Sequence, residues 1–151
     1  MSLRTLGLAS CLGLFALAPA LAEPNPAVDA RQAQFTLFAH NLAVVGSMAQ
    51  GRMEYDADAA QVAADNLYHL TRHDQGRMWP EGTDNATIDG TRALPSIWED
   101  LDDFTAKFVA LQDAAEALQG VAGDGMDAMG PAVGQLGAAC AACHDAYRAE
   151  Q

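Results

Sequence analysis

The chain has 151 residues, enough for one domain with a buried core. Half of its residues are hydrophobic and only 7% are aromatic, which excludes a disordered or collagen-like chain and favours helices over a β-sandwich. Twenty acidic residues against eight Lys and Arg give a net charge of −12. We therefore expect no nucleic-acid binding, because phosphate backbones need basic residues to replace their counterions.

The first 22 residues are typical of a secretory signal peptide. Arg4 precedes an apolar run over residues 6–21, and Ala-Leu-Ala at residues 20–22 resembles a cleavage site. The run is short for a membrane span, and no positive cluster follows it. The Leu-Ala-Ser-Cys sequence ending at Cys11 resembles a lipoprotein box, but the apolar run continues well past that cysteine. We expect export to the periplasm, cleavage before Glu23 and no membrane insertion of the processed chain.

Cleavage would remove Arg4 and Cys11. The remaining domain, residues 23–151, has 129 residues, a net charge of −13 and two cysteines, Cys140 and Cys143. A disulfide between them would close a loop of only two intervening residues and would stabilise the fold little. Stabilisation by a disulfide is therefore a poor reason for the two cysteines to be present.

Beyond residue 23 the apolar residues recur at helical spacing in four segments and show no strand-like alternation. The first helix is expected over residues 28–50, with one face formed by Phe35, Phe38, Leu42 and Val45. The second is expected over residues 56–72, with Asp56 or Asp58 as its N-cap.

The third segment alternates in steps of four and three over three heptads: Ile97, Leu101, Phe104, Phe108, Leu111, Ala115 and Leu118. The fourth, over residues 126–149, has one stripe formed by Val133, Leu136, Cys140, Cys143 and Tyr147. Stripes this narrow predict an all-α, antiparallel four-helix bundle. The connection over residues 73–94 is long for a small domain and is therefore typical of a functional segment.

The segment from Cys140 to His144 reads Cys-Ala-Ala-Cys-His, the attachment signature of c-type haem. On a helix Cys140 and Cys143 lie at i and i+3, so both thiols face one side and can form thioethers with the two vinyl groups of one porphyrin. His144, at i+4 from Cys140, lies one turn further on that face and can ligate the iron. Because both cysteines lie on the apolar stripe, covalently bound haem c would enter the bundle core.

Two other uses of a cysteine pair fit less well. A thioredoxin-like redox pair lies at a helix start after a strand, whereas this pair lies late in a helix and no strand is predicted. A structural zinc site needs four ligands, and the processed chain has only two cysteines.

With this motif, the chain resembles the cytochromes c prime, the class II c-type cytochromes. The resemblance covers the whole processed chain and rests on residues 31–35 (Arg-Gln-Ala-Gln-Phe), 79–83 (Trp-Pro-Glu-Gly-Thr), 95–98 (Pro-Ser-Ile-Trp) and 140–148. A C-terminal haem motif separates this class from other cytochromes c. The resemblance implies haem c in a four-helix bundle, of which cytochrome c′ is itself a known example. It also implies a homodimer packed through the first two helices.

The resemblance assigns the haem propionates to the N-terminal helix. Arg31 and Gln32 match residues that contact the propionates, and a guanidinium pairs well with a carboxylate. Thr91 and Arg92, in the long connection, are expected to add to this contact.

Position 35 decides the function that the resemblance implies. Low-spin, electron-transferring relatives carry a distal methionine four residues after the arginine that matches Arg31. Phe35 has no lone pair to offer, which implies a five-coordinate, high-spin iron and an apolar distal pocket that admits NO, and CO more weakly. Arg148, one turn beyond His144, matches a basic residue expected to influence ligand binding on the proximal face.

Two functions remain open at this point. The first is a periplasmic haem protein that takes up NO, protecting the cell or buffering the gas. It would not be an enzyme, because no acid–base residue can be placed over the distal face. The second is a periplasmic electron carrier that docks electrostatically with a basic redox partner.

Overall fold

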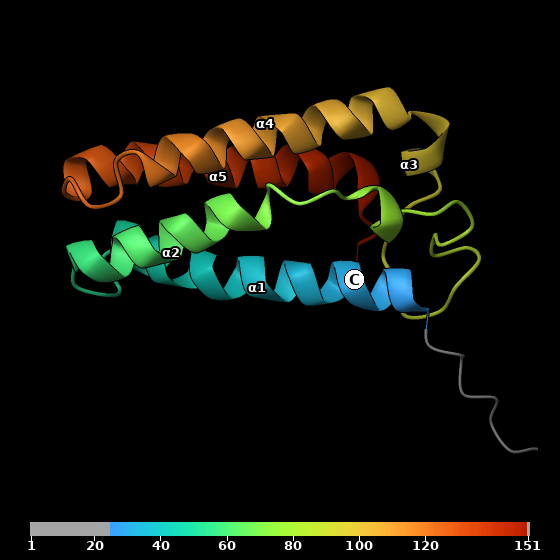
Figure 1. Ribbon diagram of the computed structural model, residues 1–151, viewed down its shortest axis with the longest axis horizontal. Helices are drawn as coiled ribbons and strands as arrows, with labels where there is room; N and C mark the ends of the chain where they lie inside the picture. The colour runs from blue at the N-terminus through green and yellow to red at the C-terminus, as the bar shows by residue number, and fades with distance from the viewer. Residues whose placement is uncertain (1–24, 151) are drawn as a thin grey trace, which may run out of the picture.

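The computed structural model describes residues 25–150, so the predicted signal peptide lies outside the described residues. Four long helices form the bundle: α1 (Pro26–Ala49), α2 (Ala57–Leu70), α4 (Leu101–Gln119) and α5 (Met126–Tyr147). Each runs antiparallel to its neighbours (Figure 1), as predicted. The connection from α2 to α4 contains a 3-10 turn, η1 (Gly76–Met78), and the short helix α3 (Ser96–Glu99). No helix in this part of the chain is long and apolar enough to cross a membrane.

Local capping sets the helix starts. The Asn25 side chain accepts hydrogen bonds from two backbone N–H groups of the first turn of α1 at 3.0 and 3.3 Å. Pro26 occupies the first position of the helix, where the backbone N–H would have no helical partner. Of the two predicted caps for α2, the structure uses Asp56, whose carboxylate accepts from the N–H of Ala59 at 2.9 Å.

The third predicted helix is interrupted at Asp100, so the prediction of one continuous segment from Ile97 was wrong. Asp100 has φ −141° and ψ 71°, which ends α3. Its side chain then caps α4 by accepting from the N–H of Asp103 at 3.0 Å. Leu101, expected on the apolar face, is 50% exposed. The side-chain bond at Asp100 competes with helical backbone bonding, and here it outweighs the continuity of the apolar stripe.

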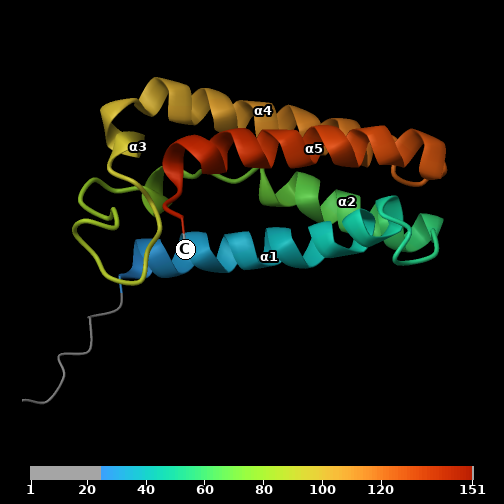
Figure 2. The ribbon, with the colours of Figure 1, turned by 180° about the vertical axis from the view of Figure 1, so that it is seen from behind.

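The C-terminal end of α5 is tied to the long connection. The helix ends at Tyr147, two residues before the predicted end, and Arg148 is extended with φ −121° and ψ 123°. Arg148 forms an isolated antiparallel bridge with Ala93, and the N–H of Ala149 donates to the carbonyl of Arg92 at 2.8 Å. Figure 2 shows the chain leaving α5 toward the α1 side of the bundle. This pairing replaces the last helical turn.

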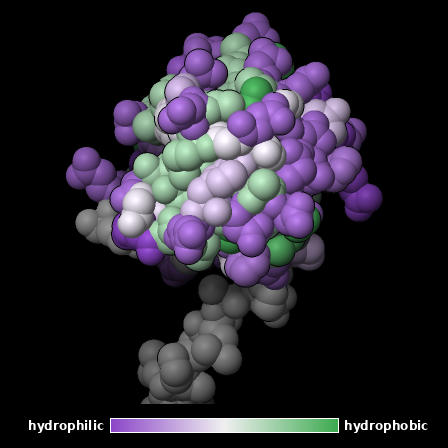
Figure 3. All heavy atoms as spheres, turned by 90° about the vertical axis from the view of Figure 1, so that its left-hand side faces the viewer, coloured by the Kyte–Doolittle hydropathy of each residue, from purple (hydrophilic) through white to green (hydrophobic). Residues whose placement is uncertain are grey.

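The main core fills one half of the bundle and contains many alanines, which let the helices approach closely. Its buried members are Val45, Met48, Ala60, Ala63, Ala64, Leu67, Ala115, Leu118, Ala122, Met129, Ala132 and Leu136. Figure 3 views this end of the bundle, where hydrophilic side chains surround weakly hydrophobic ones. A second, smaller cluster around Ala93, Ile97 and Tyr147 lies at the other end. Between these clusters the helices enclose a cavity.

Candidate functional site

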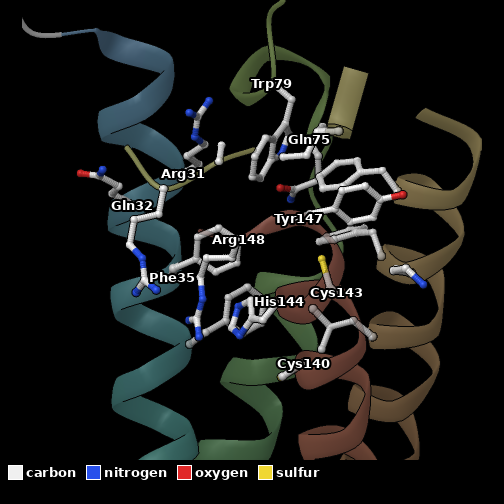
Figure 4. Close-up of a pocket in the computed structure, with 18 of the residues that line it drawn as sticks. Arg31, Gln32, Phe35, Gln75, Trp79, Cys140, Cys143, His144, Tyr147 and Arg148 are labelled. Carbon is white, nitrogen blue, oxygen red and sulfur yellow. The ribbon is translucent and has the colours of Figure 1, made fainter. Parts of the chain in front are cut away.

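A cavity of about 330 Å³ lies in the half of the bundle that holds the N-terminal end of α1. Its walls come from α1, the connection over residues 75–93, α4 and the last turns of α5 (Figure 4). Most of the wall is aromatic or aliphatic, formed by Phe35, Phe38, Trp79, Ile97, Phe104, Phe108, Leu111 and Tyr147. Such walls are typical of sites for organic cofactors, and the volume falls within the roughly 300–1,000 Å³ of ligand pockets.

The three residues of the haem signature line this cavity together. Cys140 and Cys143 are free, half-buried thiols on α5, and His144 follows them on the same side of the helix (Figure 4). Burial raises the pKa of both thiols, so both are protonated at neutral pH. Burial, together with the nearby charges of Arg148 and Arg92, lowers the pKa of His144. The imidazole is therefore neutral at pH 7 and presents a nitrogen lone pair to a metal.

Phe35 faces His144 across the cavity. The two ring centroids are 6.3 Å apart, and the ring planes meet at 67°. Two other aromatic rings, Phe38 and Trp79, hold Phe35 at centroid distances of 6.2 and 6.3 Å. The Phe35 side chain is 40% exposed, so it forms a wall of the cavity and also part of its opening.

Arg31 is only 2% exposed and is held by the long connection. Its Nη1 donates to the Met78 carbonyl at 3.1 Å and to Thr83 Oγ1 at 2.8 Å, and its Nη2 donates to the Thr83 carbonyl and to Thr91 Oγ1 at 2.9 Å. The guanidinium also stacks over Trp79, 4.7 Å from the ring centroid. Burial lowers the pKa of Arg31, but the guanidinium stays charged. No carboxylate of the described chain pairs with it.

The other predicted site residues gather around Arg31 and the end of α5. Gln32 Nε2 donates to the Gly90 carbonyl at 2.8 Å. Arg92 Nε donates to the Ala149 carbonyl at 2.8 Å, and Arg148 is exposed at the edge of the cavity. Every residue predicted for the site therefore lines one cavity.

A polar cluster behind Tyr147 was not predicted from the sequence. The Tyr147 hydroxyl donates to Asp103 Oδ2 at 2.6 Å, and Lys107 Nζ lies 3.4 Å from the same oxygen. This hydrogen bond raises the pKa of Tyr147 to about 12 and lowers the pKa of Asp103. From sequence, Asp103 resembles only a solvated residue of a helix start. The sequence offered one indication of this cluster: Tyr147 lies one turn after Cys143 on the apolar stripe, so its hydroxyl would need a partner inside the bundle.

Replacing Tyr147 by Phe is expected to make stability less dependent on pH at both extremes. The lowered Asp103 pKa stabilises the fold above the ordinary carboxyl pKa of about 3.9, and this is lost as the pH falls through the folded value. The raised Tyr147 pKa stabilises the fold below about pH 10, and this is lost as the pH rises through about 12. Melting temperatures across the pH range measure both effects, with Tyr68→Phe on α2 as the control. Superimposable curves for Tyr147→Phe and the wild type would contradict the bond.

The donor set of the cavity fits a haem. Two thiols and one neutral imidazole converge from α5, the remaining wall is largely apolar, and the buried Arg31 lacks a carboxylate partner. A planar apolar macrocycle with anionic propionates would satisfy each of these features.

The comparison with known families agrees with this geometry. Residues 26–148 match the family model described as cytochrome C′. The chain belongs to the cytochrome c′ family. Proteins of this family bind haem c, and solved relatives are four-helix bundles like this one.

Several relatives are similar along nearly their whole length. Cytochrome c′ from Cereibacter sphaeroides is 36% identical over 149 residues, covering 99% of this chain and 100% of its own. The solved cytochrome c′ from Rhodobacter sphaeroides has a TM-score of 0.81 and 38% identity, covering 83% of this chain and 96% of its own.

Other solved structures of the family show ligands or a change of assembly. A variant from Alcaligenes xylosoxidans in complex with nitric oxide has a TM-score of 0.72 and 34% identity, covering 83% of this chain and 94% of its own. Another variant from this organism binds carbon monoxide, with a TM-score of 0.71, 33% identity and coverage of 82% and 94%. A further cytochrome c′, with a TM-score of 0.75, 26% identity and coverage of 82% and 95%, shows ligand-controlled dimer dissociation.

Proposed function

We propose that this protein is a periplasmic haem protein that binds NO and CO and scavenges NO. Cys140 and Cys143 would hold haem c through two thioethers, and His144 would ligate its iron. When bound, the haem supplies an iron site for a diatomic gas and a one-electron redox couple. The proposal includes removal of residues 1–22 during export, leaving residues 23–151 as the functional domain.

The position of Phe35 carries the gas-binding proposal. Its ring lies opposite His144, with the centroids 6.3 Å apart, and it offers no lone pair. The iron would therefore have no sixth ligand from the protein. Phe38 and Trp79 pack on the same ring, so a small apolar gas meets an apolar barrier and no competing ligand.

The wall of the cavity also supports a binding function rather than catalysis. Among its lining residues there is no Asp or Glu, and the single histidine is the proposed iron ligand. No carboxylate or second histidine of the lining is thus available as a general acid or base beside Phe35. The apolar rings of Phe35 and Phe38 on this side disfavour polarised O₂ relative to NO and CO.

We propose that the protein is a homodimer packed through α1 and α2. Leu37 on α1, Val62 on α2 and Met53 between the two helices are large apolar side chains exposed to water. Association through this face would remove apolar area from water. The relative with ligand-controlled dimer dissociation provides a precedent in the family.

Electron transfer is the second candidate function, and the opening of the cavity favours it. Gln32, Gly90 and Arg148 line the cavity and are exposed, so one edge of a bound haem would lie close to solvent. The two functions are compatible with one protein, since both would use the same haem iron.

Absorption spectra of the exported, haem-loaded protein test the gas-binding proposal. We expect a high-spin ferrous spectrum with a broad Soret band after dithionite reduction, and a new nitrosyl spectrum after NO is added. The pyridine haemochrome spectrum of the same sample should show both vinyl groups saturated, as two thioethers require. Sharp low-spin α and β bands that ignore NO and CO would mean that a sixth protein ligand is present. Electron transfer would then become the leading function.

A further inference from the structure

Positive charge gathers at the cavity, although the chain as a whole is strongly acidic. Of the seven Lys and Arg between residues 25 and 150, four line the cavity: Arg31, Arg92, Lys107 and Arg148. None of the nineteen Asp and Glu in the same range lines it. If the charged residues of the wall occurred in the same proportions as in residues 25–150, carboxylates would outnumber cations there. The charge around this cavity is therefore opposite in sign to that of the whole protein.

The arginines at the opening have no carboxylate partners. Arg148 is exposed at the edge of the cavity, and Arg92 is half-buried beside it, with its guanidinium donating to the Ala149 carbonyl. Ion pairs among residues 25–150 join only Arg72 to Glu116 and Lys107 to Asp103. Because Lys107 is paired with Asp103, three lining cations lack a carboxylate partner: Arg31, Arg92 and Arg148. They exceed the two propionates of one haem by one, so the site keeps a positive charge when it is loaded.

Screening decides which charges a docking partner would feel. At physiological salt the Debye length is about 8 Å, so charges farther than that from the point of contact are largely screened. The acidic residues determine the net charge of −12, but the charged side chains that line the opening itself are those of Arg92 and Arg148, while Asp89 and Asp145 stand beside lining residues without lining it. Local charge at the opening therefore outweighs net charge once a partner has approached.

We propose that electrons enter and leave through this opening, and that it docks an acidic patch of the redox partner. Net charge alone favours a basic partner, so the distribution of charge reverses that expectation. The proposal rests on the redox function proposed above, because it assumes a haem whose edge faces Gln32, Gly90 and Arg148. Contact there would place a negatively charged group beside two guanidinium groups that have no carboxylate partner, which steers and orients the encounter.

Two small oxidants of opposite charge test the proposal on the reduced, haem-loaded protein. One electron passes from the reduced protein to the trianion hexacyanoferrate(III), giving the oxidised protein and hexacyanoferrate(II). The trication tris(phenanthroline)cobalt(III) takes up one electron in the same way. Raising the ionic strength from about 10 to about 100 mM should slow the hexacyanoferrate reaction by about three- to tenfold and should not slow the cobalt reaction.

Matched single-charge variants locate the docking point. Arg148→Gln should slow the hexacyanoferrate reaction at low salt by about two- to threefold, and Arg148→Lys should restore it. Arg52→Gln removes the same charge just past the other end of α1, roughly 25 Å along the helix from Gln32, and should leave the rate within about 1.3-fold. A hexacyanoferrate rate that rises with salt, or equal slowing by Arg52→Gln and Arg148→Gln, would overturn the proposal.

A second measurement reports the location without relying on electron transfer. In the diamagnetic CO complex of the reduced protein, the paramagnetic trianion hexacyanochromate(III) should broaden the backbone amide NMR signals of Gln32, Gly90 and Arg148. Broadening centred on Arg52 instead would overturn the docking surface. If neither oxidant reacts with the reduced protein, the electron-transfer function itself is wrong. If both oxidants react but the salt dependence or the variants behave otherwise than expected, only the docking surface is wrong. The two failures are thus distinguishable.

Discussion

Replacing Phe35 by Ala is expected to speed CO binding to the reduced, haem-loaded protein by about a hundredfold, which corresponds to about 2.7 kcal/mol of activation free energy. Phe35 faces His144 with the ring centroids 6.3 Å apart, so an iron-bound gas on that side would have to displace the phenyl ring. Phe38 and Trp79 pack on the ring and limit where it can move. Alanine removes the ring and with it the cost of displacement. Flash photolysis of the CO complex measures the rate.

The same substitution on the opposite wall provides the control. Phe108 lines the cavity from α4 and makes no ring contact with Phe35, so Phe108→Ala should change the CO rate by less than about threefold. Phe35→Met tests the same position from the other direction, because its thioether offers the lone pair that phenylalanine lacks. It should produce a low-spin spectrum and slow gas binding. An unchanged CO rate in Phe35→Ala would place Phe35 away from the iron.

The bundle could be predicted from the sequence because its signals are local and repeated. Apolar residues at helical spacing predicted four helices, and the observed ends of α1 and α2 differ from the predictions by one or two residues. The break at Asp100 was missed because the stripe continues through it without a gap. A side-chain cap of one residue gives a weaker signal than three heptads, yet in the folded chain it decides where α4 begins.

The part of the candidate site that lies on α5 could be predicted from the sequence. The contacts between α1 and the long connection could be predicted less well. The spacing of Cys140, Cys143 and His144 places all three on one side of α5, which the structure reproduces. The hydrogen bonds of Arg31 join residues 47 to 60 positions apart, and no local pattern encodes such pairs. The resemblance linked Arg31 to haem propionates but gave no reason for it to hold Thr83 and Met78. That role emerges only when the connection is folded.

Replacing Arg31 by Ala is therefore expected to lower the free energy of unfolding by about 3 kcal/mol, even where a haem remains bound. The substitution removes the four hydrogen bonds that Arg31 donates to Met78, Thr83 and Thr91, and it also removes the cation that stacks on Trp79. Thr83 and Thr91 are buried, so water cannot freely replace the lost partner. Amides of residues 76–91 should exchange hydrogen faster, while those of α4 should change little. Chemical denaturation and hydrogen-exchange mass spectrometry measure the two effects.

Arg31→Lys separates the charge from the geometry. Lysine keeps the cation but cannot reach all of these acceptors from one planar group, so it should recover less than half of the lost stability. Arg77→Ala is the matched control, because Arg77 is an exposed arginine of the same connection, and it should cost less than about 0.5 kcal/mol. Should Arg31→Ala also fall below that value, with exchange over residues 76–91 unchanged, Arg31 would serve the haem propionates alone. The connection would then be held by its own contacts, such as the turn around Asp84, whose carboxylate accepts from the N–H groups of Ala86 and Thr87.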